Sequence, residues 1–280
     1  MSAPPLSADA PIGIFDSGVG GLSVLRHVRA LLPSEELLYF ADSGFAPYGE
    51  KPEAVIVGRV LAIAAFFLRF RVKAMVVACN TATAAAIAAL RATYPELQVV
   101  GVEPGLKPAA SLTQSGVVGV LATHATLASD KFQTLQQQVA ESTGIQFLPQ
   151  ACNGLADQIE KGELNSRDTA MLVERYVAPL VRQRADTLVL GCTHYPFVQA
   201  LIAKAAADAG RAVTLVDTGE PVARQLQRLL SRQGLLRAGS EPGRLSAYTT
   251  GSRSALSSAF RQLLGLEVAA EEVATAIGKT

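Results

Sequence analysis

The sequence predicts an α/β protein of two pseudo-symmetric three-layer domains with largely parallel sheets and an active site in the cleft between them. Three observations predict this class. Short β-rich runs alternate with longer helical patterns, which is typical of βα units around parallel strands. Several strand-and-turn segments recur along the chain, and 49% of the 280 residues are hydrophobic while only 18% are charged, which is ample for a buried core.

The elements follow one another at the spacing of βα units. Strands are expected at Ile12–Phe15, Leu37–Ala41, Ala74–Ala78, Gln98–Gly101, Val117–Leu121, Gln146–Leu148, Thr187–Leu190, Thr214–Val216 and Leu245–Tyr248. Helices are expected at Leu22–Leu32, Glu53–Phe70, Thr83–Ala92, Ala125–Glu141, Arg167–Arg182, Val198–Ala209, Pro221–Gln233 and Ser254–Leu263.

An internal repeat relates the two halves of the chain. The segment GIFDSG resembles GVLATH, VVACNT resembles LVLGCTH, and VEPG resembles VDTG, in the same order and at nearly constant spacing. The repeat predicts two similar domains, one formed by residues 1–98 together with 210–280 and the other by residues 99–209. Ligands of such sheets lie outside the carboxyl ends of the strands, where the recurring turns fall.

Composition and charge exclude several functions. The formal net charge is +1 with scattered basic residues, which disfavours a nucleic-acid partner. The first eleven residues have no apolar core and no basic residue, so a disordered lead-in is expected rather than a signal peptide. The apolar run Val60–Leu68 is far shorter than the ~20 residues of a membrane span. Three cysteines are too few for a disulfide scaffold, and a cytoplasmic location with free thiols is expected.

Two of these thiols stand in the repeated turns. Cys79 ends an apolar strand and precedes Asn80 and Thr81, and Cys192 ends another strand before Thr193. A thiol at a helix N-terminus lies near positive charge and free N–H groups, which favour the thiolate. Buried structural cysteines are common, but a matched pair in duplicated turns favours a functional role for both.

Two loops beside these turns are further candidates. The glycine-rich Asp16–Gly21 segment follows the first strand, and its spacing fits neither a dinucleotide loop nor a Walker motif. Asp16 is either a functional acid beside a cysteine or a helix N-cap. The loop from Ala41 to Gly49 follows another strand and presents hydroxyl and backbone donors, so it is a candidate for ligand contact.

Other chemistries fit less well. The three histidines have no ligand spacing with the cysteines, so no metal site is expected, and His194 suits proton transfer or substrate orientation beside Cys192. Cys152 lacks a counterpart in the repeat and is interpreted as structural. A serine hydrolase lacks the G-x-S-x-G turn, and a cysteine hydrolase leaves one of the paired thiols unexplained.

The motifs together resemble the glutamate racemases of the aspartate/glutamate racemase superfamily. The resemblance covers nearly the whole chain, and the segments that carry it are IGIFDSGVGGLSVLR, YFADSGFAPYGEK, CNTAT, GVEPGLKPA and LGCTHYPF. It implies a cytoplasmic isomerase that interconverts L- and D-glutamate without pyridoxal phosphate or another cofactor, and supplies D-glutamate for peptidoglycan, cell wall biogenesis and cell shape.

The resemblance also implies roles for particular residues. Cys79 corresponds to the group that takes the α-proton from D-glutamate, and Cys192 to the group that takes it from L-glutamate. Glu160 matches an acidic residue that the family often has near the second cysteine. The implied substrate contacts are Asp16, Ser17, Tyr48, Gly49, Asn80, Thr81, Thr193 and His194.

Racemisation removes an α-proton and returns one to the opposite face, so two acid/base groups are the economical design. Asp16 and His194 are the candidates to hold or move protons for the two thiols. A racemase of another amino acid such as aspartate, or a catalytically silent binding protein of the same fold, is the alternative. No membrane partner is expected, and a homodimer is left open.

Overall fold

The computed structural model describes residues 7–274. The chain forms two compact units, one of residues 7–102 and 219–274 and the other of residues 103–218. The expected disordered lead-in falls partly on residues 1–6, which lie outside the described residues. Within that described part of the chain, no helix combines the length and the apolar character that crossing a membrane requires.

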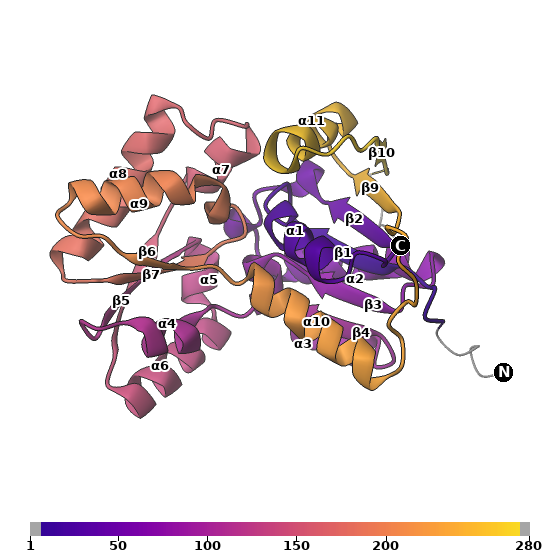
Figure 1. The fold of residues 1–280 in the computed structure, drawn as a ribbon, viewed down its shortest axis with the longest axis horizontal. Helices are drawn as coiled ribbons and strands as arrows, with labels where there is room; N and C mark the ends of the chain where they lie inside the picture. Colours follow the sequence, from indigo (N-terminus) through magenta and orange to yellow (C-terminus); the bar gives the residue numbers. More distant parts are fainter. Residues whose placement is uncertain (1–6, 275–280) are drawn as a thin grey trace. The chain divides into compact units, whose positions relative to one another are not determined.

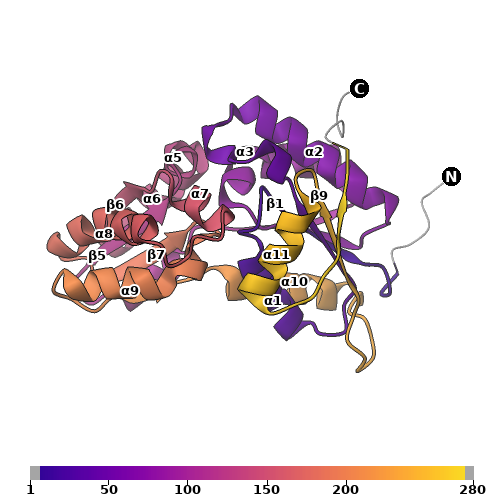
Figure 2. The ribbon, with the colours of Figure 1, turned by 90° about the horizontal axis from the view of Figure 1, so that it is seen from above.

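The first unit is a six-stranded parallel sheet covered by helices on both faces (Figures 1 and 2). The strand order is β10-β9-β2-β1-β3-β4. Helices α2 and α3 cover one face, and α1, α10 and α11 cover the other. The elements are β1 (Ile12–Asp16), α1 (Leu22–Leu31), β2 (Leu37–Ala41), η1 (Ser43–Phe45), η2 (Tyr48–Glu50), α2 (Glu53–Arg69), β3 (Ala74–Val77), α3 (Asn80–Thr93), β4 (Gln98–Gly101), α10 (Gly219–Arg232), β9 (Leu245–Thr249), α11 (Arg253–Leu264) and β10 (Ala270–Glu272).

The second unit is a four-stranded parallel sheet in the order β6-β5-β7-β8. Helices α7, α8 and α9 share one apolar core with this sheet, and α4 and α6 share another on the opposite face. The elements are α4 (Leu106–Leu112), β5 (Val117–Ala122), α5 (His124–Ala128), α6 (Asp130–Thr143), β6 (Gln146–Ala151), α7 (Leu155–Glu160), α8 (Arg167–Arg182), β7 (Thr187–Gly191), η3 (Tyr195–Val198), α9 (Gln199–Asp208) and β8 (Thr214–Val216).

The two sheets repeat one topology. The order β2-β1-β3-β4 in the first unit corresponds to β6-β5-β7-β8 in the second, and each central strand pairs in parallel with its two neighbours. The recurring segments of the sequence therefore fall at equivalent places, since Cys79 follows β3 and Cys192 follows β7. The predicted pair of three-layer α/β domains with parallel sheets is confirmed. Strands β9 and β10 extend the first sheet alone.

Several expected elements were wrong in detail. The single helix expected over Ala125–Glu141 is two helices, because Ser129 is extended and its hydroxyl accepts the Phe132 N–H at the start of α6. Helices α4 and α7 and strand β10 were not expected. They are short, and their sequences (LKPAASL, LADQIE and AEE) carry little periodic pattern.

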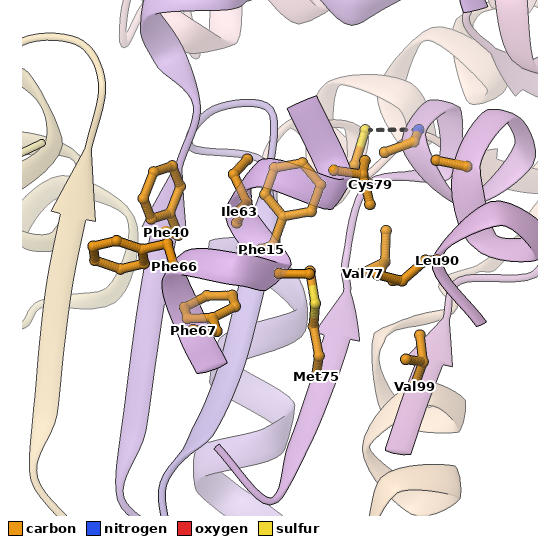
Figure 3. Close-up of a cluster of buried hydrophobic side chains, with 14 of the residues drawn as sticks. Phe15, Phe40, Ile63, Phe66, Phe67, Met75, Val77, Cys79, Leu90 and Val99 are labelled. Atoms are coloured by element: carbon orange, nitrogen blue, oxygen red, sulfur yellow. Dashed lines mark hydrogen bonds between the residues drawn. The ribbon is translucent and has the colours of Figure 1, made fainter. Parts of the chain in front are cut away.

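The sequence of α2 explains its burial. All but three of its residues are apolar or glycine, and its inner face lies in the main core of the first unit beside Phe15, Phe40 and Met75 (Figure 3). The expectation of a buried helix around Val60–Leu68 is confirmed on this inner face, while the side chain of Leu68 remains 37% exposed. The same core reaches Cys79, so packing fixes the end of β3.

A carboxylate stabilises the start of the second sheet. Asp186 accepts the Thr113 hydroxyl at 2.6 Å, the Ser115 N–H at 2.6 Å and the Gln114 N–H at 2.9 Å. Partial burial by itself raises the pKa of Asp186, but these hydrogen bonds and one from Thr187 outweigh it and lower the pKa to about 2. The ionised side chain thus ties the segment that precedes β5 to the start of β7.

Asp186→Asn is expected to lower the free energy of unfolding of the second unit by about 1–3 kcal/mol at neutral pH, because hydrogen bonds to a charged acceptor are lost. The folded pKa is depressed, so the wild-type contribution is complete above the unfolded pKa of ~3.9 and disappears as pH falls towards about 2. Urea denaturation of both proteins from pH 7 downward measures this difference. Asp208→Asn is the control, because it removes only an exposed ion pair with Lys204, and solvent-exposed pairs contribute little to stability. A stability difference independent of pH would contradict the account.

Candidate active site

In the first unit, Cys79 joins strand β3 to helix α3. It is the N-cap residue of α3, and its Sγ atom accepts the Ala82 N–H at 3.4 Å (Figure 3). The helix therefore begins at Asn80 rather than at the expected Thr83, and the Cys79 sulfur itself caps it. The N–H groups and the positive end of the helix dipole favour a negative charge on this buried sulfur.

The turn after β1 lies against the same thiol. The Ser17 hydroxyl is 3.6 Å from the Cys79 sulfur, within reach of a weak hydrogen bond. Asp16 is fully buried, and its Oδ2 atom accepts the Gly18 N–H at 2.9 Å. Asp16 does not cap α1, whose N-cap residue is Gly21 and has no side-chain cap. A Cβ atom on Gly21 would lie 2.5 Å from the Asp16 Cβ, so this glycine permits a close approach within the chain.

Asn80 is buried with its side-chain amide unsatisfied. Its side chain is 5% exposed, and neither Nδ2 nor Oδ1 has a hydrogen-bond partner among the described residues. Buried polar atoms of this kind are rare and cost free energy. A polar ligand beside Cys79 would satisfy both atoms. Thr81, the next residue, is also buried.

Cys192 in the second unit has a different environment. A 3₁₀ turn (η3) follows it, and helix α9 begins at Gln199, one residue after the expected Val198, so this thiol does not lie directly at a helix N-terminus. The nearby cation is His194 instead, whose Nδ1 atom lies 3.5 Å from the Cys192 sulfur. Gly191 is required just before the thiol, because a Cβ atom there would lie 2.8 Å from the Leu121 carbonyl oxygen.

His194 links Cys192 to Glu160. The Nε2 atom lies 2.6 Å from the Glu160 Oε1 atom, and the histidine is buried while Glu160 is partly exposed. Burial by itself lowers the pKa of His194, but the charges and hydrogen bonds of Cys192 and Glu160 outweigh it and hold the pKa well above 6.5. With the Nε2 proton directed to the carboxylate, Nδ1 remains to exchange a proton with the sulfur.

Cys152 and Tyr195 belong to the same apolar core as Cys192. Both are buried in the core of the second unit, and burial followed by the charge of Cys192 raises the pKa of the Cys152 thiol. A thiol held protonated in an apolar core is unreactive, in agreement with the structural role expected for Cys152. Thr193 is also buried in this turn.

The expected site residues therefore form two groups. Asp16, Ser17, Asn80 and Thr81 surround Cys79, while Thr193, His194 and Glu160 surround Cys192. Tyr48 and Gly49 lie in η2 of the first unit, and the Tyr48 hydroxyl donates to Asp42. Asp42 and Arg59, which sequence reasoning did not single out, hold this segment. Arg59 was hidden because it is an arginine inside an otherwise apolar helix.

Comparison with known proteins adds a family. The Asp/Glu/Hydantoin racemase family matches residues 21–226. A glutamate racemase of Pseudomonas syringae is 53% identical over 240 residues, which cover 86% of this chain and 85% of the relative. A structure of Francisella tularensis glutamate racemase with D-glutamate has a TM-score of 0.82 at 29% identity, covering 95% of this chain and 98% of that one. Escherichia coli glutamate racemase with L-glutamate and the activator UDP-MurNAc-ala has a TM-score of 0.80 at 33% identity, covering 94% and 98%.

Glu160→Gln is expected to lower the pKa of His194, because the amide keeps a hydrogen-bond acceptor but removes the negative charge. NMR titration of the imidazole carbon-bound protons measures this shift, and the chain has only three histidines to assign. Glu174→Gln, on the exposed side of α8, is the matched control and should leave the titration unchanged. An unchanged His194 pKa in Glu160→Gln would show that the carboxylate does not hold the imidazolium.

Proposed function

Because the chain belongs to the Asp/Glu/Hydantoin racemase family, we propose that it interconverts L- and D-glutamate by a cofactor-independent mechanism with two cysteine bases. The observation that carries the proposal is the equivalent placement of Cys79 and Cys192, each within two residues of the end of the corresponding strand of a repeated sheet. One thiol acts on each face of the substrate α-carbon. The D-glutamate product serves peptidoglycan synthesis.

The proton inventory requires one thiolate and one thiol in each turnover. The thiolate removes the α-proton as the C–H bond breaks, and the thiol on the opposite face donates its proton to the carbanionic carbon. The two sulfurs thereby exchange protonation states, which leaves the enzyme ready for the opposite enantiomer. General acid and base groups act best when their pKa values lie near the working pH, so each sulfur needs a neighbour that stabilises its charged form.

Different neighbours meet that need in the two units. The Cys79 thiolate is supported by the Ala82 N–H, the N-terminus of α3 and the Ser17 hydroxyl. The Cys192 thiolate is supported by the imidazolium of His194, which Glu160 holds in place. Asp16 is buried in the turn that contains Ser17, and it is the acid near Cys79 that corresponds to Glu160 near Cys192.

The substrate contacts follow from the groups around each thiol. The unsatisfied Asn80 amide can donate to a carboxylate and accept from an ammonium, which are the polar groups of an amino acid. Thr81, Thr193 and the segment of Tyr48 and Gly49 complete the proposed set. Glutamate rather than aspartate is the proposed substrate, because the relative at 53% identity is a glutamate racemase. A silent binding protein would have no need of both thiols.

Cys79→Ala and Cys192→Ala are each expected to abolish racemisation, because either change removes the acid or base for one face of the α-carbon. Polarimetry of the purified chain with L-glutamate, and separately with D-glutamate, measures the loss in the absence of added cofactor. Cys152→Ala is the matched control and should retain racemisation, because its thiol is held protonated in the core. Substantial racemisation by either of the first two variants would overturn the two-base assignment.

A further inference from the structure

A buried carboxylate stands directly after strand β2. Asp42 is fully buried, and its two oxygens accept four hydrogen bonds. Oδ2 accepts from the Tyr48 hydroxyl at 2.5 Å and from the Arg59 Nε at 2.9 Å. Oδ1 accepts from the Arg59 Nη2 at 2.8 Å and from the Thr250 hydroxyl at 2.7 Å. Each oxygen thus receives two donors, which compensates the burial of its charge.

Arg59 comes from helix α2 and is also buried, at 7% exposure. Its guanidinium group binds both oxygens of Asp42 in a fork, and the ring centroid of Phe45 lies 3.8 Å from its Cζ atom. Burial lowers the pKa of Arg59, but the carboxylate outweighs this effect and raises it. Lysine could not reproduce a planar fork stacked on an aromatic ring.

The segment between Asp42 and α2 is held along its length. The Gly44 N–H donates to the Thr250 hydroxyl at 3.1 Å, and a Cβ atom on Gly44 would lie 2.5 Å from the Thr250 carbonyl oxygen. Phe45 lies under Arg59, and Tyr48 is tied to Asp42. Three elements distant in sequence, namely the ends of β2 and β9 and the first half of α2, therefore determine where this segment lies.

Tyr48 donates its only hydroxyl proton to Asp42. Burial, followed by the negative charge and hydrogen bonding of Asp42, raises the pKa of Tyr48 far above its ordinary value, so the phenol stays protonated. A phenol has one proton to donate, and that proton lies between Tyr48 and the carboxylate. The hydroxyl therefore has no proton left for a substrate carboxylate. Tyr48 also belongs to the same core as Cys79, so its placement bears on that thiol's surroundings.

We propose that Asp42 and Arg59 are positioning residues for glutamate turnover, and that the Tyr48 hydroxyl acts through them rather than by contact with the substrate. This inference rests on the proposed function and deepens it. The buried ion pair fixes the Tyr48–Glu50 turn beside the Cys79 side of the site. Substrate contacts from this segment then come from groups other than the Tyr48 hydroxyl.

A double-mutant cycle between Tyr48→Phe and Asp42→Asn tests the proposal, with KM and kcat measured from both enantiomers of glutamate. Each single variant is expected to raise KM by roughly tenfold, with a smaller effect on kcat, because a displaced binding segment weakens alignment of the substrate. The KM of the double variant should be no higher than that of Asp42→Asn, since in that variant the Tyr48 hydroxyl has already lost its carboxylate partner. Arg59→Lys should raise KM similarly despite keeping its charge.

Glu35→Gln is the matched control. It breaks another buried ion pair of the same unit, with Lys73, at the opposite end of the parallel strands. It should lower the melting temperature at least as much as Asp42→Asn but leave KM and kcat unchanged, which separates positioning from general destabilisation. If the Asp42→Asn protein does not fold, the cycle between Tyr48→Phe and Arg59→Lys carries the same prediction of non-additivity.

Three results would overturn the proposal. Fully additive effects in the cycle would show that the Tyr48 hydroxyl acts on the substrate directly. Unchanged KM and kcat in both Asp42→Asn and Arg59→Lys would show that the ion pair is structural only. Wild-type KM in the folded Tyr48→Phe protein would show that the hydroxyl positions nothing. If the wild-type chain and Glu35→Gln both fail to racemise glutamate, the proposed function itself fails, and this inference with it.

Discussion

The position of a cysteine between the end of a buried parallel strand and the turn that follows it determines the surroundings of both candidate catalytic thiols. At that position the backbone before the thiol is fixed by the sheet and its covering helices, while the side chain lies at the edge where parallel strands end. Cys79 after β3 and Cys192 after β7 both satisfy this constraint. The repeat in the sequence reflects this shared architecture, and the two sheets have corresponding strand orders.

Identical positions do not produce identical chemistry. Cys79 is stabilised by backbone donors at the start of a helix, whereas Cys192 has a 3₁₀ turn after it and depends on a histidine and a carboxylate. The first arrangement has a fixed field that does not titrate. The second includes a titratable imidazolium, so the charge that favours the thiolate depends on pH. The two sulfurs thus have physically distinct surroundings.

The sequence was sufficient for the architecture because the strands are apolar and regularly spaced, and the repeat gave the correspondence of the units. The sequence was less informative where a side chain, rather than the backbone, makes the hydrogen bond that sets the local structure. The motif CNTAT alone does not predict that the Cys79 sulfur caps α3. The helical pattern around Ser129 likewise does not show that this residue is extended. The Asp42–Arg59 pair was missed for a related reason, because an arginine in an apolar helix gives no sign of a carboxylate seventeen residues earlier in the chain. Glu160 and His194 were both expected, but their contact joins residues distant in sequence.

Early incorporation of deuterium from solvent tests the two-base claim most directly. In deuterated water, each enantiomer of glutamate is supplied separately, and the substrate and product pools are separated at low conversion and analysed by mass. Two thiols on opposite faces predict that the product carries deuterium at the α-carbon while the unreacted substrate retains its proton. Deuterium that enters the substrate pool as fast as the product would indicate a single base serving both faces, and would contradict the account.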